Sequence, residues 1–297
     1  MDNKSATRRC LVVAGWMLPL CIMSSVTLAG SVTQPGSTLG TAPGAPLAPG
    51  FYFSNTADWG YRNPSTRLFV DHPVYTWSTP WMIFGARFQV MAETAFNAQI
   101  TPGNRAEGYY NPLLTGQLAW DLGHGWGFSY TLGAYFDVPQ PRSWSSNSIN
   151  QRFAVSYTGG GWNLTANLIY GIQLNPFTDR PQNAPCPAPL TMNGCNADFT
   201  NLDLTATKKF GNWEVGPVAF GSMDVSTPIS TYQRASQFAA GALVGYDFGV
   251  ARLQVYGTRD VYVHNYSGLD TRVWARVTLP LWTSPEVSPP VSPVARK

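Results

Sequence analysis

Segments in which apolar and polar side chains alternate recur from about residue 51 to residue 282 and constrain the fold of this chain more than any other feature. Each segment spans roughly 9 to 14 residues, and a period of two is typical of β-strands. In residues 251–264, one face carries Leu253, Val255, Val261 and Val263, and the other carries Arg252, Gln254, Tyr256 and Asp260. No apolar run between residues 51 and 282 approaches the roughly 20 residues that a membrane-spanning helix needs. The pattern therefore predicts an all-β protein.

Short connections alternate with longer ones along the chain, which indicates how the strands are joined. The tight turns are expected at Ser78-Thr79-Pro80, Gly123-His124-Gly125, Gly159-Gly160-Gly161, Gly211-Asn212 and Gly249, and the longer polar connections near residues 58–66, 100–108, 139–150, 175–198, 226–235 and 265–270. This arrangement gives about 12 strands and places both chain ends on the side of the tight turns. It is typical of outer-membrane barrels, which have short periplasmic turns and longer extracellular loops.

Aromatic residues flank the tight connections and indicate a membrane interface. They include Trp77, Trp81, Trp120, Trp126, Trp162, Phe210, Trp213 and Phe248. Charged residues make up only 12% of the chain, about half the usual share of a soluble protein. A soluble β-sandwich would also alternate, but it would not explain the aromatic belt or the alternation of connections. We therefore predict a transmembrane antiparallel β-barrel of about 12 strands whose apolar side chains face lipid.

The two ends of the chain differ from the predicted barrel. Residues 1–29 combine basic residues, an apolar stretch and Thr27-Leu28-Ala29, which predicts a signal peptide cleaved after Ala29 and export to the bacterial outer membrane. A membrane-spanning helix and a lipoprotein site at Cys21 are weaker alternatives. Residues 30–50 predict a flexible periplasmic linker, with a plug inside the barrel as the alternative. Residues 51–282 form the predicted barrel, and residues 283–297 a Pro-rich tail.

Two of the four cysteines remain after removal of the predicted signal peptide. Cys186 and Cys195 lie in a proline-rich stretch without metal-ligand spacing or a neighbouring histidine. We expect them to form a disulfide within a long outer loop, in keeping with an oxidising compartment.

Charged and aromatic residues opposite the apolar faces are the candidate functional residues. A charge on the lipid face costs about 2 to 4 kcal/mol at the midplane for Arg or Lys, so these residues should line the lumen. The candidates are Arg87, Glu93, Arg252, Tyr256, Asp260, Arg272, Trp274 and Arg276, together with Asp203, Glu214 and Asp247. They could pair with one another in a filled interior. Alternatively, Arg252, Arg272 and Arg276 with Tyr256 and Trp274 could form a cationic and aromatic wall that contacts a permeating solute.

The sequence disfavours several other functions. Lys4, Arg8, Arg9 and Asp2 account for two of the three net positive charges, so the mature chain lacks the basic surface that nucleic-acid binding requires. The three histidines, His72, His124 and His264, are not expected to share a metal ion. A lipolytic site at His264 and Ser267 is the weakest alternative, because residues 265–268 are ordinary turn formers. We expect no cofactor, no metal and no enzymatic activity.

The run Trp77-Ser78-Thr79-Pro80-Trp81-Met82-Ile83-Phe84-Gly85-Ala86 resembles a signature of the outer-membrane transporter family named after the meta pathway of phenol degradation. Asn111-Pro112-Leu113-Leu114 and Trp213-Glu214-Val215-Gly216 are also similar to that family. The resemblance covers roughly residues 51–282. It implies passage of small hydrophobic or aromatic compounds, and it carries over no catalytic residues.

Two hypotheses of function follow. The first is a monomeric barrel in outer-membrane lipid that serves as a channel or transporter for passive uptake or efflux of small hydrophobic or aromatic compounds. The second is a closed barrel that acts as a surface binding or adhesion module through its extracellular loops, above all residues 175–198. Whether the lumen is open decides between them, because 12 strands enclose only a modest interior.

Overall fold

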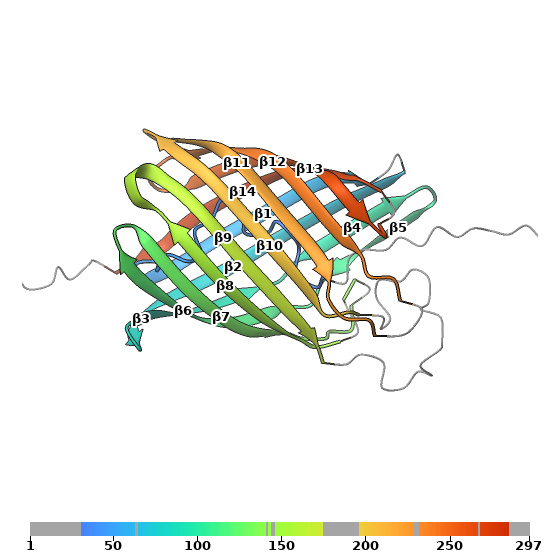
Figure 1. Ribbon diagram of the computed structural model, residues 1–297, viewed down its shortest axis with the longest axis horizontal. Coiled ribbons are helices and arrows are strands. Elements are labelled where there is room, and N and C mark those ends of the chain that lie inside the picture. The colour runs from blue at the N-terminus through green and yellow to red at the C-terminus, as the bar shows by residue number, and fades with distance from the viewer. Residues whose placement is uncertain are drawn as a thin grey trace, which may run out of the picture.

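The chain folds into one closed antiparallel β-barrel in the computed structural model (Figure 1). The structure describes residues 31–62, 65–140, 142–143, 146–174, 196–228, 232–266 and 268–284. The strands are β1 (Gly50–Arg62), β2 (Thr66–Ile83), β3 (Ala86–Glu93), β4 (Phe96–Thr101), β5 (Asn104–Tyr109), β6 (Leu113–Gly123), β7 (Trp126–Tyr135), β8 (Ser148–Tyr157), β9 (Trp162–Gln173), β10 (Phe199–Phe210), β11 (Trp213–Asp224), β12 (Ser236–Asp247), β13 (Arg252–His264) and β14 (Asp270–Thr283). A single turn of 3₁₀-helix, Gly159–Gly161, precedes β9.

The labelled strands correspond to 12 strands around the barrel, because two barrel strands are interrupted and carry two labels each. β3 and β4 both pair with β2 and together form one barrel strand. β5 and β6, which pair with β4 and β3, form the next. β1 pairs with β14 on one side and with β2 on the other, so the sheet has no free edge. Closure satisfies the backbone hydrogen bonds of every strand, as hydrocarbon surroundings require. The predicted fold is confirmed.

Apolar side chains point out of the barrel and polar ones point in. In β13, Leu253 and Val255 are about 40% exposed, whereas Gln254 and Tyr256 are almost completely buried. The same alternation runs through β9, where Leu164 and Leu168 are exposed and Asn163, Thr165 and Asn167 are buried. A soluble protein would bury the apolar face instead. The outer surface is therefore suited to lipid. Asp71, which lies on the outer face by register, accepts a hydrogen bond of 2.8 Å from Asn55.

Aromatic side chains form a belt at the end of the barrel that carries the tight turns. Phe51 stacks on Trp77 and also contacts Trp282, with ring centroids 5.7 and 6.2 Å apart. Further contacts join Trp77 to Trp81, Trp120 to Phe128, Trp126 to Tyr157, and Trp213 to Tyr246. Such a belt is typical of the interface between hydrocarbon and headgroups.

Three of the predicted connections are wrong in position. Ser78-Thr79-Pro80 lies inside β2, at a register shift between Ser78 and Met82, and the turn falls at Phe84 and Gly85, both with positive φ. Turns of this kind match the twist of a hairpin. The predicted long connections at residues 58–66 and 100–108 are also wrong. β1 continues to Arg62 and β2 begins at Thr66, and β4 and β5 are separated only by residues 102–103. The turns at Gly123–Gly125, Gly211–Asn212 and Gly249, and the long connections near residues 139–150, 175–198, 226–235 and 265–270, separate strands as predicted.

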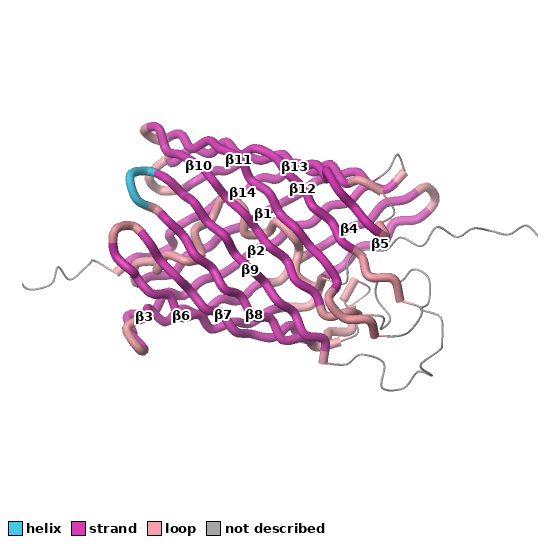
Figure 2. The backbone as a smooth tube through the Cα atoms, in the orientation of Figure 1, coloured by secondary structure: helices cyan, strands magenta, loops and turns pink. Residues whose placement is uncertain are grey.

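The segment before β1 lies inside the barrel. Residues 31–49 are here called the N-terminal plug. From Pro49 at the tight-turn end, the plug extends into the lumen and contacts inward side chains of β6, β8, β9, β10, β13 and β14 (Figures 1 and 2). The expectation of a flexible linker is therefore corrected in favour of the alternative plug. The predicted signal peptide, Cys186, Cys195, Ser267 and most of the tail lie outside the described residues. Within the described part of the chain, no helix is long and apolar enough to cross a membrane.

Candidate functional site

The N-terminal plug has little structure of its own and depends on the barrel wall for hydrogen bonds. Its internal backbone bonds are a few tight turns, such as those from Leu39 N to Gly36 O and from Thr41 N to Thr38 O. Its composition of Gly, Pro, Ser, Thr and Ala offers no periodic apolar face that could form a helix or a strand. Because buried backbone groups need partners, the remaining groups bond to polar side chains of the wall.

Two oppositely charged residues hold the turn at residues 36–39 of the plug from opposite sides. Asp203 on β10 accepts hydrogen bonds from the backbone nitrogens of Gly36 (2.9 Å) and Thr38 (3.0 Å) and from the Thr38 hydroxyl (2.7 Å). Arg276 on β14 donates to the carbonyl oxygens of Ser37 (2.5 Å) and Leu39. Among the ion pairs between described residues, none includes either side chain. The plug backbone thus solvates a buried carboxylate and a buried guanidinium at once.

Leu39 anchors the plug in an apolar cluster within the lumen. Its side chain is completely buried and packs in a cluster with Val218, Phe220, Ala239, Leu243, Tyr256 and Trp274. Tyr256 and Trp274 stack with ring centroids 5.4 Å apart, and Trp274 Nε1 donates to Thr258 Oγ1 at 2.9 Å. The predicted aromatic pair therefore packs with the plug in this structure.

Glycine is required where the plug approaches the wall most closely. A Cβ atom on Gly40 would lie 2.5 Å from a methyl group of Leu243 and 2.9 Å from the side-chain nitrogen of Gln254, and Gly40 has a φ of +77°. Side chains other than hydrogen are strained at such a φ. The sequence of the plug therefore fits this lumen closely.

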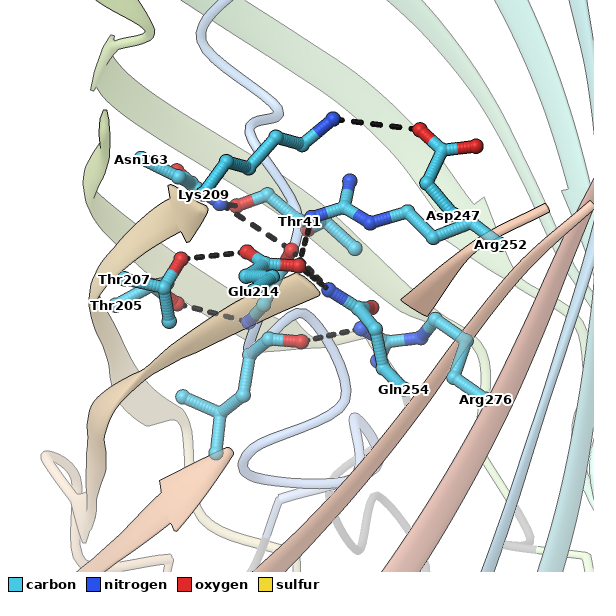
Figure 3. A network of polar contacts seen from close by, with 12 residues as sticks. Thr41, Asn163, Thr205, Thr207, Lys209, Glu214, Asp247, Arg252, Gln254 and Arg276 are labelled. Carbon is cyan, nitrogen blue, oxygen red and sulfur yellow. Dashed lines mark hydrogen bonds and ion pairs between the residues drawn. The ribbon is translucent and has the colours of Figure 1, made fainter. Parts of the chain in front are cut away.

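Glu214 on β11 organises the polar contacts around Gly40 (Figure 3). Its carboxylate accepts hydrogen bonds from Thr207 (2.5 Å), from Gln254 (2.9 Å) and from Arg252. Gln254 also donates to the carbonyl oxygen of Gly40 at 2.9 Å. Asn163 reaches the same carbonyl oxygen from β9 at 3.2 Å. The predicted inward residues Glu214 and Arg252 are thus paired with each other beside the plug.

A second ion network lies deeper in the lumen. Glu93 on β3 binds Arg152 at 2.6 Å and His72 at 2.8 Å. Arg152 also donates to Asn150 Oδ1 at 2.7 Å, and Asn150 in turn donates to Thr33 of the plug at 3.0 Å. His72 and Arg152 were not predicted as lumen residues, although both lie at inward positions of their strands.

A third ion network lies towards the end of the long loops. Arg272 binds Asp58 at 2.7 Å and Asp270 at 3.2 Å, and Arg62 binds Asp270 at 2.6 Å. Asp260 accepts a bond from the backbone nitrogen of Asp270 at 2.7 Å. Of the other predicted residues, Arg87 donates to Thr79 O at 3.3 Å near the tight turns, and Asp247 pairs at the rim with Lys209 at 3.4 Å. The predicted lumen residues therefore belong to several separate polar networks instead of one site.

The described residues enclose two cavities in the lumen beside the plug. The inner cavity has a volume of about 320 Å³ and lies between plug residues 37–47 and a wall that includes Tyr52, Val74, Gln89 and Met91. The outer cavity, about 100 Å³, is bordered by the start of the plug and by residues of the long-loop end such as Leu68 and Tyr110. His72 and Glu93 border both cavities. Both cavities therefore lie along the wall of β1, β2 and β3, and the His72–Glu93 pair lies between them.

One long connection folds over the outer cavity. Arg142, between β7 and β8, borders this cavity and donates to Asn97 Oδ1 at 2.5 Å and to Gln99 Oε1 at 3.4 Å. Burial lowers the pKa of the Arg142 guanidinium, because removal from water disfavours its charged form. Arg142 thus ties this connection to β4 at the outer mouth.

A closed barrel with an apolar outer face and a polar lumen has the architecture of an outer-membrane β-barrel protein. The sequence profile of the family described as "Putative MetA-pathway of phenol degradation" matches residues 48–277. The chain belongs to this family, and the resemblance found in its sequence is confirmed. No curated protein matches the sequence.

Solved structures of outer-membrane barrels share the fold. An outer membrane channel from Pseudomonas putida F1 is similar with a TM-score of 0.59 and 11% identity, over 83% of this chain and 99% of that chain. The β domain of the Bordetella autotransporter BrkA is similar with a TM-score of 0.50 and 12% identity, over 79% of this chain and 100% of that chain. At such identities the likeness shows the fold alone.

Proposed function

We propose that this protein is an outer-membrane channel through which small hydrophobic or aromatic compounds pass passively. The observation that carries the proposal is a pair of lumenal cavities along β1, β2 and β3 whose linings share His72 and Glu93. A solute could follow this path while the plug stays bound to the opposite wall.

The lining of the path supports the solute class. Tyr52, Val74, Met91 and Leu47 contribute apolar surface to the inner cavity, and Leu68, Val70 and Tyr110 contribute it to the outer cavity. Ligand sites of small molecules are lined mainly by apolar and aromatic side chains with a few polar groups. The description of the family, which names phenol degradation, agrees with aromatic solutes. The proposed activity is transport without catalysis, and the Pseudomonas protein that shares the fold is likewise a channel.

The position of the plug supports export with a cleaved signal peptide. Ser31 and Val32 lie inside the lumen next to the outer cavity. Cleavage after Ala29 would leave a short free end that can enter the barrel from the tight-turn side. We further propose that the protein is a monomer surrounded by lipid, because exposed apolar side chains such as Leu132, Leu168, Val244 and Val273 are distributed over strands around the barrel.

Ion current through single molecules in planar lipid bilayers tests the proposal. The wild-type protein should conduct, and millimolar concentrations of a small aromatic solute such as benzyl alcohol should interrupt the current reversibly. His72→Trp, which fills the junction of the cavities, should reduce the current, whereas His264→Trp at the long-loop end of β13 should not. A folded protein without current, or a current insensitive to His72→Trp, would contradict the proposal.

A further inference from the structure

Two buried amide side chains carry atoms without hydrogen-bond partners at the inner cavity. Gln89 and Asn167 each line the cavity and are 1% exposed. Gln89 Nε2, a donor, and Asn167 Oδ1, an acceptor, have no partner among the described residues. Because buried polar groups are nearly always hydrogen-bonded, such atoms beside an unfilled space indicate a binding site for a polar group.

The neighbours of these two amides are already engaged. Gln117, opposite Gln89 in the register of β3 and β6, donates to Pro43 O of the plug and to the hydroxyls of Ser129 and Thr131. Asn167 uses its own amide nitrogen to bond Thr38 of the plug at 3.0 Å. The plug therefore positions the cavity but leaves one donor and one acceptor for another molecule.

The charges around the inner cavity are balanced, which disfavours a charged ligand. Three guanidinium groups line it, those of Arg152, Arg252 and Arg276. Arg152 and Arg252 are paired with Glu93 and Glu214. Arg276 is in no ion pair among the described residues, but it already donates to Thr56, to Tyr256 and to the plug turn that also bonds to Asp203. An added charge would compete with these existing contacts and would lose its hydration.

We propose that the inner cavity binds an uncharged solute whose apolar body carries one group that both donates and accepts hydrogen bonds, such as a carboxamide or a hydroxyl. Gln89 Nε2 donates to the oxygen of that group and Asn167 Oδ1 accepts from its N–H or O–H. Tyr52, Val74 and Met91 contact the body of the solute. At about 320 Å³ the cavity lies at the lower end of small-molecule sites, and a cavity of about 150 Å³ suffices for benzene. This inference deepens the proposed function and rests on it for its biological meaning.

Calorimetric titration of the folded protein in detergent with benzamide, benzoate and benzylammonium tests the proposal. These probes share size and ring but differ in charge. Benzamide should bind at least tenfold more tightly than either ion. Gln89→Met and Asn167→Leu should each weaken benzamide about fivefold, the effect of one lost neutral hydrogen bond. Gln173→Met is the matched control, because Gln173 Nε2 also has no partner but lines neither cavity.

A second variant keeps the test independent of the buried amides. Val74→Phe, on β2 next to the strand of Gln89, should fill the cavity and abolish benzamide binding while the barrel stays folded. Tighter binding of benzoate than of benzamide, or undiminished binding by Gln89→Met, Asn167→Leu and Val74→Phe, would overturn the proposal. The two experiments test the two proposals separately. Site-specific benzamide binding without ion current would refute only the channel function. Ion current without benzamide binding would refute only the binding site.

Discussion

Replacement of Asp203 by asparagine should release the N-terminal plug. The carboxylate is 2% exposed and accepts three hydrogen bonds from the plug turn, two of them on Oδ2 from the nitrogen and hydroxyl of Thr38. In Asp203→Asn, one oxygen becomes an amide nitrogen, which cannot accept a hydrogen bond. If Oδ1 stays the oxygen, the bond from Gly36 persists in weaker form and both bonds from Thr38 are lost.

The magnitude follows from the number of bonds lost. A hydrogen bond to a charged group contributes about 1.5 to 3 kcal/mol, so two contribute about 3 to 6 kcal/mol. The neutral amide is easier to bury than a carboxylate, which offsets part of this loss. We therefore expect the lower end, about 3 kcal/mol, which corresponds to a shift of about a hundredfold in the equilibrium between docked and released plug.

Single-channel recording measures this shift as the fraction of time in a state of high conductance. Asp203→Asn should raise that fraction about a hundredfold. Asp260→Asn is the matched control, because Asp260 is also a buried inward carboxylate but bonds to Gln237 and to the backbone of Asp270 instead of the plug. If Asp203→Asn gates like wild type, or if both variants open equally, the reasoning about the plug is refuted.

Three further changes have distinct expected outcomes. Leu39→Ala removes the buried anchor and should destabilise the docked plug by about 2 to 5 kcal/mol, seen as faster proteolysis within residues 31–49 of an otherwise intact barrel. Gly40→Ala should also release the plug and raise the current, because its Cβ would lie 2.5 Å from Leu243, whereas Gly249→Ala, with a similar φ but no atom within 4 Å, should leave the current unchanged. Leu168→Arg, on the outer face halfway along β9, should lower the free energy of unfolding in lipid vesicles by about 2 to 4 kcal/mol. Phe210→Arg, at the rim, should lower it by about 1 kcal/mol or less. Equal losses would contradict a membrane midplane at the level of Leu168.

The barrel itself could be predicted from the sequence because its physical cause is local. Lipid on one side and polar contacts on the other impose a period of two on each strand, as Leu253 to Tyr256 show. Turn positions follow less directly from the sequence. Ser78-Thr79-Pro80 has the composition of a turn, yet it forms an irregularity within β2, and the actual turn uses Phe84 at a positive φ.

The predicted loop at residues 58–66 failed for a related reason. Gly60, within that predicted connection, lies in β1, where a Cβ would come within 2.6 Å of the Arg272 side chain. The glycine therefore makes room for a lumenal side chain on the neighbouring strand. Such a reason becomes visible only when the two strands, more than 200 positions apart, are placed side by side.

The candidate site was predictable only in part. Inward charges such as Glu93, Arg272 and Arg276 follow from the alternation, but their partners do not, because these depend on register across the barrel. The plug gave no periodic signal, since its structure arises from bonds to distant residues such as Asp203 rather than from its own pattern. Unpartnered amides such as Gln89 are likewise visible only in the folded chain.

The most direct test of the account compares the conductance of the full mature barrel with that of a barrel refolded from residue 48 onward. Without the plug, Asp203, Thr205 and Arg276 lose the plug backbone groups that they bind, and water fills the space that the plug occupied. The account predicts a small, solute-sensitive current with the plug and a several-fold larger, poorly selective current without it. Equal currents, or no current from either folded barrel, would contradict it.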